Sequence, residues 1–133
     1  MVVRSKDFKN TIGYQFTIDF DKDALEFADV QALDLEGLHQ ENFGLSHLDQ
    51  GMITTSWNGS STSLIDDTKL FAVTFKALKD TKISRSIKTS SSLTPAEAYN
   101  KDTEMLKVDL QFMNKNELNN EEFRLLQNTP NPF

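Results

Sequence analysis

The chain of 133 residues has no cysteine, which excludes disulfide bonds, thiolate metal sites and cysteine nucleophiles. It has only 14 lysine and arginine residues against 20 acidic ones, and its formal net charge is -6. Affinity for nucleic acid rests on cations that neutralise phosphates, so this balance argues against nucleic acid and against anionic membrane surfaces as partners. No apolar run approaches the ~18 residues of a membrane-spanning helix, so we expect no insertion into a membrane.

Several segments alternate apolar and polar residues, which is the pattern of half-buried antiparallel strands. The pattern is strongest in residues 12–20, where Ile, Tyr or Phe occupies every second position, and it recurs in 71–77 and 106–112. Weaker patterns predict further strands at 52–57 and 83–89 and edge strands at 2–8 and 96–99. So many short strands predict an all-β fold, an antiparallel jelly-roll-like β-sandwich of about eight to nine strands.

The alternation ends near residue 113, and this sets the predicted domain boundaries. We expect one β-sandwich domain over residues 1–113, monomeric and of ordinary size for a single domain, with a long connection at 32–51 across one end. Residues 114–122 are polar and lack a strand pattern, which predicts a linker. Residues 123–133 follow as a separate C-terminal tail.

The C-terminal tail carries the most specific motif of the chain, Phe-Arg-Leu-Leu-Gln-Asn-Thr-Pro-Asn-Pro-Phe. It resembles the opening of the C-terminal sorting domain used by the type IX secretion system. The matching positions are Gln127, Asn128, Pro130, Asn131, Pro132 and Phe133. The resemblance implies that residues 123–133 are the truncated start of a sorting signal. It also implies that the parent protein is exported through the outer membrane, to the cell surface or the medium.

The body of the chain, residues 2–112, contains three segments that together form a recognisable pattern: the predicted strand at 13–21, Leu25-Glu26-Phe27 shortly after it, and the later predicted strand at 70–77. In these segments the body resembles the cohesin-like modules of the cohesin and carbohydrate-binding-module superfamily. The resemblance implies a nine-stranded jelly roll. Founding members of the family bind dockerin modules on one sheet face, whereas related folds bind polysaccharide. Neither activity follows from the fold alone, because function belongs to the site.

Signals for catalysis and metal binding are weak. His39 and His47 lie near acidic residues in the long connection, but no nucleophile motif accompanies them, so we expect no enzyme. Asp19, Asp21 and Asp23 form an Asp-x-Asp-x-Asp triplet that can supply oxygen ligands to calcium, the one cofactor that the sequence suggests. The alternative for this triplet is a solvated strand end.

Two kinds of binding surface are compatible with the sequence. Trp57 and Tyr99 could stack on a sugar, although the position of Trp57 in its strand leaves it facing either way. Gln15, Thr17 and Thr74 are uncharged candidates for a protein-docking sheet face, which a partner can bury without stranding a charge. The leading hypothesis is therefore a protein-interaction or adhesion module of an exported protein. A carbohydrate-binding module and a structural spacer are the alternatives.

Overall fold

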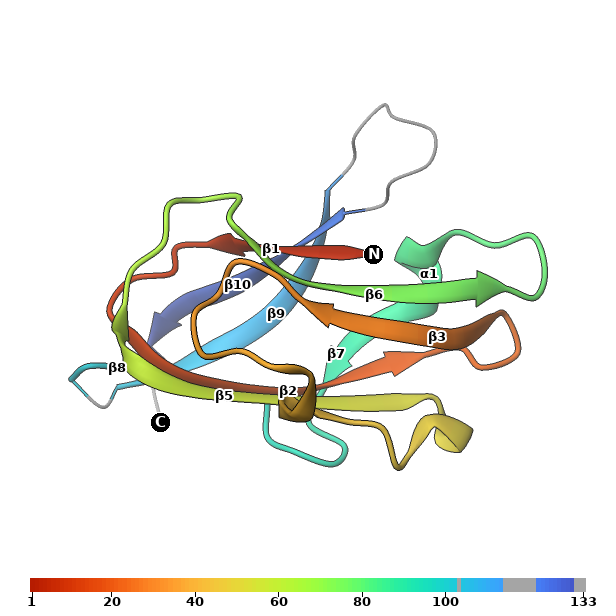
Figure 1. Cartoon of the computed structure of the whole chain (residues 1–133), viewed down its shortest axis with the longest axis horizontal. Helices are drawn as coiled ribbons and strands as arrows, with labels where there is room; N and C mark the ends of the chain where they lie inside the picture. Colours follow the sequence, from red (N-terminus) through yellow and green to blue (C-terminus); the bar gives the residue numbers. More distant parts are fainter. Residues whose placement is uncertain (103, 114–121, 131–133) are drawn as a thin grey trace.

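The computed structural model describes residues 1–102, 104–113 and 122–130, and most of its elements are strands (Figure 1). The strands are β1 (Val2–Lys6), β2 (Thr11–Phe20), β3 (Leu25–Ala32), β4 (Phe43–Gly44), β5 (Met52–Thr62), β6 (Lys69–Ala77), β7 (Ile87–Ser90), β8 (Glu97–Asn100), β9 (Met105–Met113) and β10 (Glu122–Pro130). The remaining elements are the one-turn helix α1 (Ile83–Ser86) and the 3-10 turns η1 (Gln40–Asn42) and η2 (Leu48–Gln50). The predicted all-β class is confirmed. Within these ranges no helix has the length and apolarity to span a bilayer.

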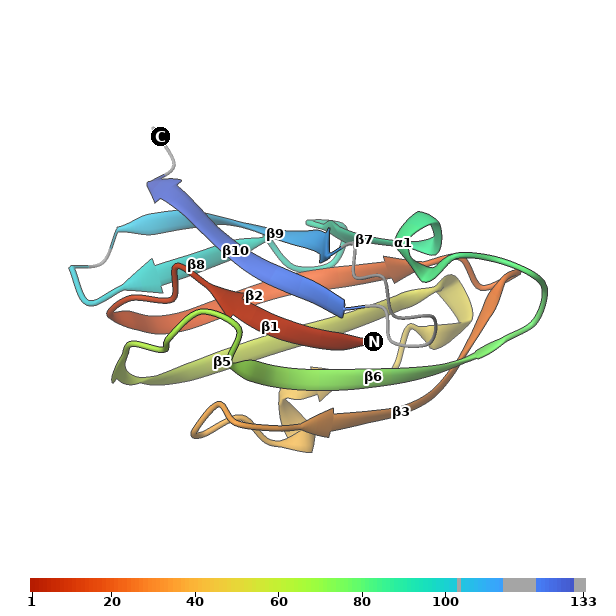
Figure 2. The same ribbon diagram turned by 90° about the horizontal axis from the view of Figure 1, so that it is seen from above.

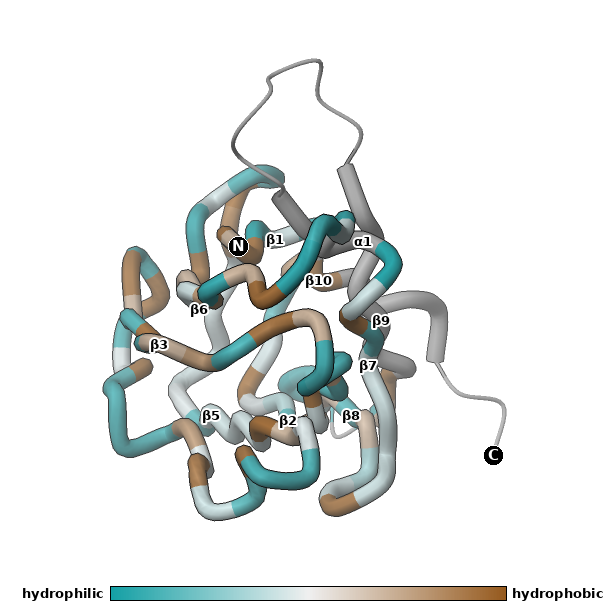
Figure 3. The backbone as a smooth tube through the Cα atoms, turned by 90° about the vertical axis from the view of Figure 1, so that its right-hand side faces the viewer, coloured by the Kyte–Doolittle hydropathy of each residue, from teal (hydrophilic) through white to brown (hydrophobic). Residues whose placement is uncertain are grey.

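The strands form one hydrogen-bonded sheet that folds over into two facing layers. Their order is β3-β6-β1-β10-β9-β8-β2-β5-β4, and β7 also pairs with β2. Figures 1 and 3 show β3, β6 and β1 in one layer and β2 and β5 in the other. Strand β1 runs parallel to β10, whereas the other pairs described are antiparallel. The result is the antiparallel β-sandwich that the sequence predicts.

The core lies between the two layers, and the alternation along each strand explains which side chains fill it. On β2, Tyr14, Phe16 and Ile18 point inward and are at most 2 % exposed. Phe16 meets Phe71 of β6 across the interior, with ring centroids 6.5 Å apart. Burying this apolar surface is the main favourable term in folding, at roughly 25 cal/mol per Å². Other fully buried side chains come from β1 and the loop after it and from β3, β5, β6 and β10: Val3, Phe8, Leu25, Ile53, Trp57, Leu70, Val73 and Leu125.

Three predicted strands differ from the observed ones. Strand β1, expected at an edge, pairs with β6 on one side and β10 on the other. Strand β8, also expected at an edge, lies between β2 and β9. The segment predicted as a strand at 83–89 begins instead as the helical turn α1, because the Arg85 N–H donates to the Lys82 carbonyl oxygen at 3.0 Å. Strand β7 therefore begins only at Ile87.

Strand β10 extends the sandwich beyond its predicted boundary at residue 113. It pairs with β1 and β9, and Leu125 on this strand is 0 % exposed within the core. The expectation that residues after 113 are only linker and tail is therefore wrong for 122–130. Residues 114–121 of the linker predicted at 114–122, and the motif residues Asn131, Pro132 and Phe133, lie outside the described residues.

The connection from β3 to β5 closes one side of the core. Leu35 and Leu38 are 2 % and 4 % exposed, and they cover the interior where β3 ends. The turn η2 then ends at Gly51, whose φ of 72° is a left-handed conformation that glycine adopts without strain. The Phe20 N–H donates to the Gly51 carbonyl oxygen at 2.8 Å, which fixes the start of β5 against the end of β2.

Candidate functional site

An uncharged surface lies on the outer side of β2 and β5. Outward side chains on these strands alternate with the buried ones, and the strands are in antiparallel register, with Gln15 opposite Ser56 and Thr17 opposite Thr54. We call this surface the β2–β5 face and define it by Gln15, Thr17, Thr54, Ser56 and Asn58. Glu97 and Tyr99 of β8 extend it on the side of β2 away from β5, because they pair with Gln15 and Gly13.

The β2–β5 face is polar but carries no charged side chain at its centre. Ser56 and Asn58 are exposed, and Gln15 and Thr54 are half-buried. Two carboxylates at its margin already accept hydrogen bonds. Asp19 accepts from the Ser90 hydroxyl at 3.0 Å, and Glu97 accepts from the Tyr99 hydroxyl. A partner can therefore cover this face without burying an unpaired charge, which is the main electrostatic cost of docking.

The two threonines predicted for the docking face occupy different positions. Thr17 is 0 % exposed although it points outward, because Ser90 of β7 and Thr54 of β5 flank it in register. Its hydroxyl has no hydrogen-bond partner among the described residues. Thr74 is exposed, but it lies on β6, in the layer opposite β2 and β5. Its neighbour Val73 faces the core, so Thr74 points outward from that opposite layer. The residues that the sequence suggested as one face thus belong to two opposite faces.

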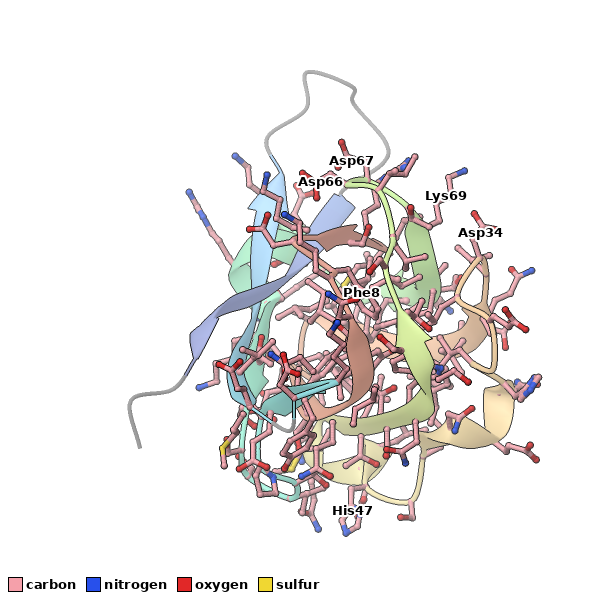
Figure 4. All side chains as sticks on the ribbon, turned by 90° about the vertical axis from the view of Figure 1, so that its left-hand side faces the viewer. Phe8, Asp34, His47, Asp66, Asp67 and Lys69 are labelled. Atoms are coloured by element: carbon pink, nitrogen blue, oxygen red, sulfur yellow. The ribbon has the colours of Figure 1, made fainter. Side chains whose placement is uncertain are left out.

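Trp57 does not offer a ring to a sugar. It points inward from β5, is 1 % exposed, and packs between Tyr14 and Phe8 with ring centroids 5.7 and 5.8 Å away. Figure 4 shows Phe8 in the interior, between the layers. The prediction of Trp57 as a binding residue is therefore wrong, since stacking on a flat ring needs an open ring face.

Tyr99 is the remaining aromatic candidate, and its ring is half-buried. Its hydroxyl donates to Glu97, and this hydrogen bond to the carboxylate is the main reason that the pKa of Tyr99 is raised. Among the other aromatic side chains that the structure describes, only Phe27 and Phe75 are partly exposed, and they pack edge to face against each other. No row of open rings forms in this part of the chain, so the surface does not have the aligned rings expected of a polysaccharide-binding platform.

The predicted calcium ligands do not converge. Asp19 lies on the outer side of β2 and is held by Ser90, whereas an oxygen of Asp21 accepts the N–H of Asp23 at 3.0 Å in the turn that follows. Another pair, Asp66 and Asp67, lies in the loop between β5 and β6 (Figure 4), where Asp66 forms a 3.0 Å ion pair with Lys6. In the described part of the chain no three carboxylates or histidines cluster closely enough to hold a metal ion.

A cleft of about 350 Å³ opens at one end of the β2–β5 face, where β2 meets α1 and β7. Phe20 and Ile87 supply its apolar lining. Asp21, Arg85 and Lys88 line it as well, and all three are exposed. The uncharged face therefore ends in a hollow with side chains of both signs, which gives this end of the surface the means to orient a partner. The sequence pattern gives no sign of the cleft, because it predicts a strand where α1 forms.

Comparison with known families agrees with this architecture. The model of the cohesin domain family matches residues 2–112, which is most of the chain. Comparison with curated proteins and with solved structures gives no match. A family match of this extent, over a β-sandwich with the expected layers, places the chain in the cohesin domain family.

Proposed function

We propose that this domain binds another protein module, of the dockerin type, through its β2–β5 face. Cohesin domains are non-catalytic protein-interaction modules. The observation that supports the choice of face is its uncharged centre, bordered by carboxylates that already accept hydrogen bonds. Two glycines also keep the face free of bulky side chains, because Gly13 pairs with Asn58 and Gly44 pairs with Thr54.

The opposite face, on β3 and β6, suits a partner less well. There Glu26 lies opposite Lys76, and Asp29 lies opposite Thr74, all on exposed positions. A partner that covered this face would have to remove several charges from water, which costs free energy unless each gains a matching group. The two faces thus differ in the number of charged side chains that a docking partner would have to remove from water.

The test compares a substitution on each face. Purified chain is titrated by calorimetry with dockerin modules from the same genome, as wild type, Ser56→Arg and Thr74→Arg. Both positions are exposed strand residues, so neither arginine should change stability by more than about 0.5 kcal/mol. Arginine at position 56 puts bulk and an unpaired charge at the centre of the face, so we expect at least a tenfold loss of affinity, or about 1.4 kcal/mol. Thr74→Arg should bind like wild type.

Other outcomes would contradict the proposal in distinct ways. Equal loss by both variants, or loss by Thr74→Arg alone, would exclude the β2–β5 face. Absence of binding to every dockerin module would exclude this class of partner and favour a structural spacer. Binding to a glycan array in its place would restore the carbohydrate alternative, and it would require a platform other than Trp57.

We also propose that the parent protein is exported with the help of the C-terminal motif. Cohesin domains usually occur in extracellular or cell-surface proteins, and the motif with Gln127, Asn128 and Pro130 resembles a sorting signal. The test is expression of the complete gene product that contains this chain in a host that has type IX secretion. Wild type should reach the medium or surface, whereas a variant with alanine at the three named positions should stay in the cell. Retention of wild type would contradict the proposal.

A further inference from the structure

Strand β10 fills a slot in the sandwich that two other strands define. On one side it pairs in parallel with β1, from Val2 opposite Glu122 to Lys6 opposite Leu126. On the other side it pairs antiparallel with β9, from Met113 opposite Glu122 to Asp109 opposite Leu126. Figure 2 shows β10 running between these strands. The backbone groups on the β1 and β9 edges that face β10 therefore depend on this one segment for their hydrogen bonds.

Removing β10 would leave two open strand edges facing each other. Strand β1 would keep only β6 as a partner, and β9 would keep only its short pairing with β8, where Glu97 to Tyr99 oppose Lys107 to Met105. Unpaired N–H and C=O groups in a buried or half-buried strand cost free energy, and an open edge binds other extended chains readily. The backbone N–H and C=O groups of β1 and β9 would therefore be enough to bind an extended strand in the slot.

One side chain fixes the register of the strand in the slot. Leu125 is 0 % exposed and lies in the same core cluster as Val3 and Phe71. It pairs with Ser5 of β1, which is itself fully buried and satisfied, since its hydroxyl donates to the Ile65 carbonyl oxygen at 2.8 Å. A shift of one residue would turn Leu125 toward the outside, so the pocket beneath it selects one alignment.

We propose that the slot between β1 and β9 is a peptide-binding site for an extended segment with a leucine at the position of Leu125, which this chain fills with its own segment Glu122–Pro130. Recognition combines main-chain hydrogen bonds on both edges with a single buried leucine, as in other cases where a strand is added to a sheet. The covalent connection through residues 114–121 keeps the segment at a high effective concentration. The site is separate from the β2–β5 face, so its existence does not depend on the proposed function.

The same pairing bears on the C-terminal motif. Gln127 lies opposite Val108 and Pro130 opposite Leu106, so the first half of the motif is part of the sheet. A receptor that bound these residues in extended form would compete with β9 for the same backbone groups. Occupation of the slot and capture of the motif from Gln127 onward therefore exclude each other.

The experiment starts from the full chain, with a protease recognition sequence placed within residues 114–121, and cuts it only after folding. The cut protein is unfolded in guanidinium with an excess of a fluorescein-labelled synthetic peptide of residues 119–133 and is then refolded by dilution. We expect the label to enter the folded protein at one peptide per chain. A peptide with Leu125→Asp should bind at least about tenfold more weakly, and a scrambled peptide should not bind.

Fluorescence of Trp57 reports in parallel whether the sandwich is folded, because this residue is buried in the core. Without added peptide, the two cut fragments should co-elute in size-exclusion chromatography. Separation of the fragments while Trp57 stays buried would overturn the proposal, because the body would then not hold the strand. Loss of the fold that the labelled peptide does not restore would overturn it too, as would equal binding of the Leu125→Asp peptide.

Discussion

The indole N–H of Trp57 donates a hydrogen bond to the carbonyl oxygen of Glu36, 3.0 Å away. This bond joins the inner side of β5 to the connection between β3 and β4. The ring beneath it packs against Tyr14 and Phe8, so one residue links the aromatic core to the segment that covers it. The single tryptophan is therefore a structural anchor, and its replacement should lower the free energy of unfolding.

Replacing Trp57 should destabilise the domain, and alanine should cost more than phenylalanine. Trp57→Phe keeps an aromatic ring but leaves the Glu36 carbonyl oxygen without this donor, so we expect a loss of about 1–3 kcal/mol in the free energy of unfolding. Trp57→Ala adds a cavity and should cost about 3–5 kcal/mol. Guanidinium unfolding followed by far-UV circular dichroism measures both. Losses below about 0.5 kcal/mol for Trp57→Ala would contradict the buried position.

Gly51 should tolerate alanine less well than Gly37. Both have positive φ, 72° and 82°, so alanine is strained at either position, at a cost of about 1–2 kcal/mol. A methyl group at Gly51 would also collide with the Phe20 carbonyl oxygen, whereas at Gly37 its nearest neighbour is Trp57 Nε1 at 3.4 Å. Thermal unfolding of the two alanine variants should therefore give the lower melting temperature for Gly51→Ala. The reverse order would show that the turn after η2 is built differently.

Leu125→Ala tests whether the C-terminal segment belongs to the fold. Because the side chain is fully buried, the substitution should lower the free energy of unfolding by about 2–5 kcal/mol. Ile65→Ala is the matched control, since Ile65 is 84 % exposed and its replacement should change stability by less than about 0.5 kcal/mol. Urea denaturation of both variants decides the matter. A Leu125→Ala protein as stable as the control would mean that β10 is a free tail.

Tyr14 should make the domain sensitive to alkaline pH. Burial in the core, partly offset by the nearby Thr55 hydroxyl, raises the pKa of Tyr14 well above its ordinary value of 10.0. The folded chain therefore keeps a proton that the unfolded chain loses above about pH 10, so stability should fall there by up to about 1.4 kcal/mol per pH unit. Below pH 10 this contribution is fully present.

The control for this pH effect is Tyr14→Phe. The Tyr14 hydroxyl has no aligned hydrogen-bond partner in the described part of the chain, so its removal should cost little stability at neutral pH. Unfolding free energies measured from pH 8 to about 11 should fall less steeply for the variant than for wild type. Parallel profiles would mean that Tyr14 titrates as freely in the folded state as in the unfolded one.

Local patterns in the sequence predicted the inner side of the sandwich well. Alternation every second residue placed Tyr14, Phe16 and Ile18 together on one side of a strand, and all three are buried. This works because one local rule, the direction of successive side chains, decides burial once a strand forms. The same pattern misled at 83–89, because a hydrogen bond from the Arg85 N–H to the Lys82 carbonyl oxygen closes a helical turn before the strand begins.

Features that depend on distant partners could not be predicted in this way. The sequence gives no sign of which strands are neighbours, so Thr74 of β6 was grouped with Gln15 although the two lie on opposite faces. Strand β10 was missed for the same reason: only its pairing with β1 and β9 shows that Leu125 belongs to the core. The sequence leaves Trp57 facing either way, and only the position of β5 against the connection that carries Glu36 decides its direction.

The most direct test of this account is the affinity of a dockerin module for the Ser56→Arg variant, compared with Thr74→Arg and wild type. We expect a loss of at least about tenfold for Ser56→Arg and no change for Thr74→Arg, with all three proteins equally stable. Unchanged binding by Ser56→Arg, in a protein that binds the module as wild type, would contradict the claim that the β2–β5 face holds the partner.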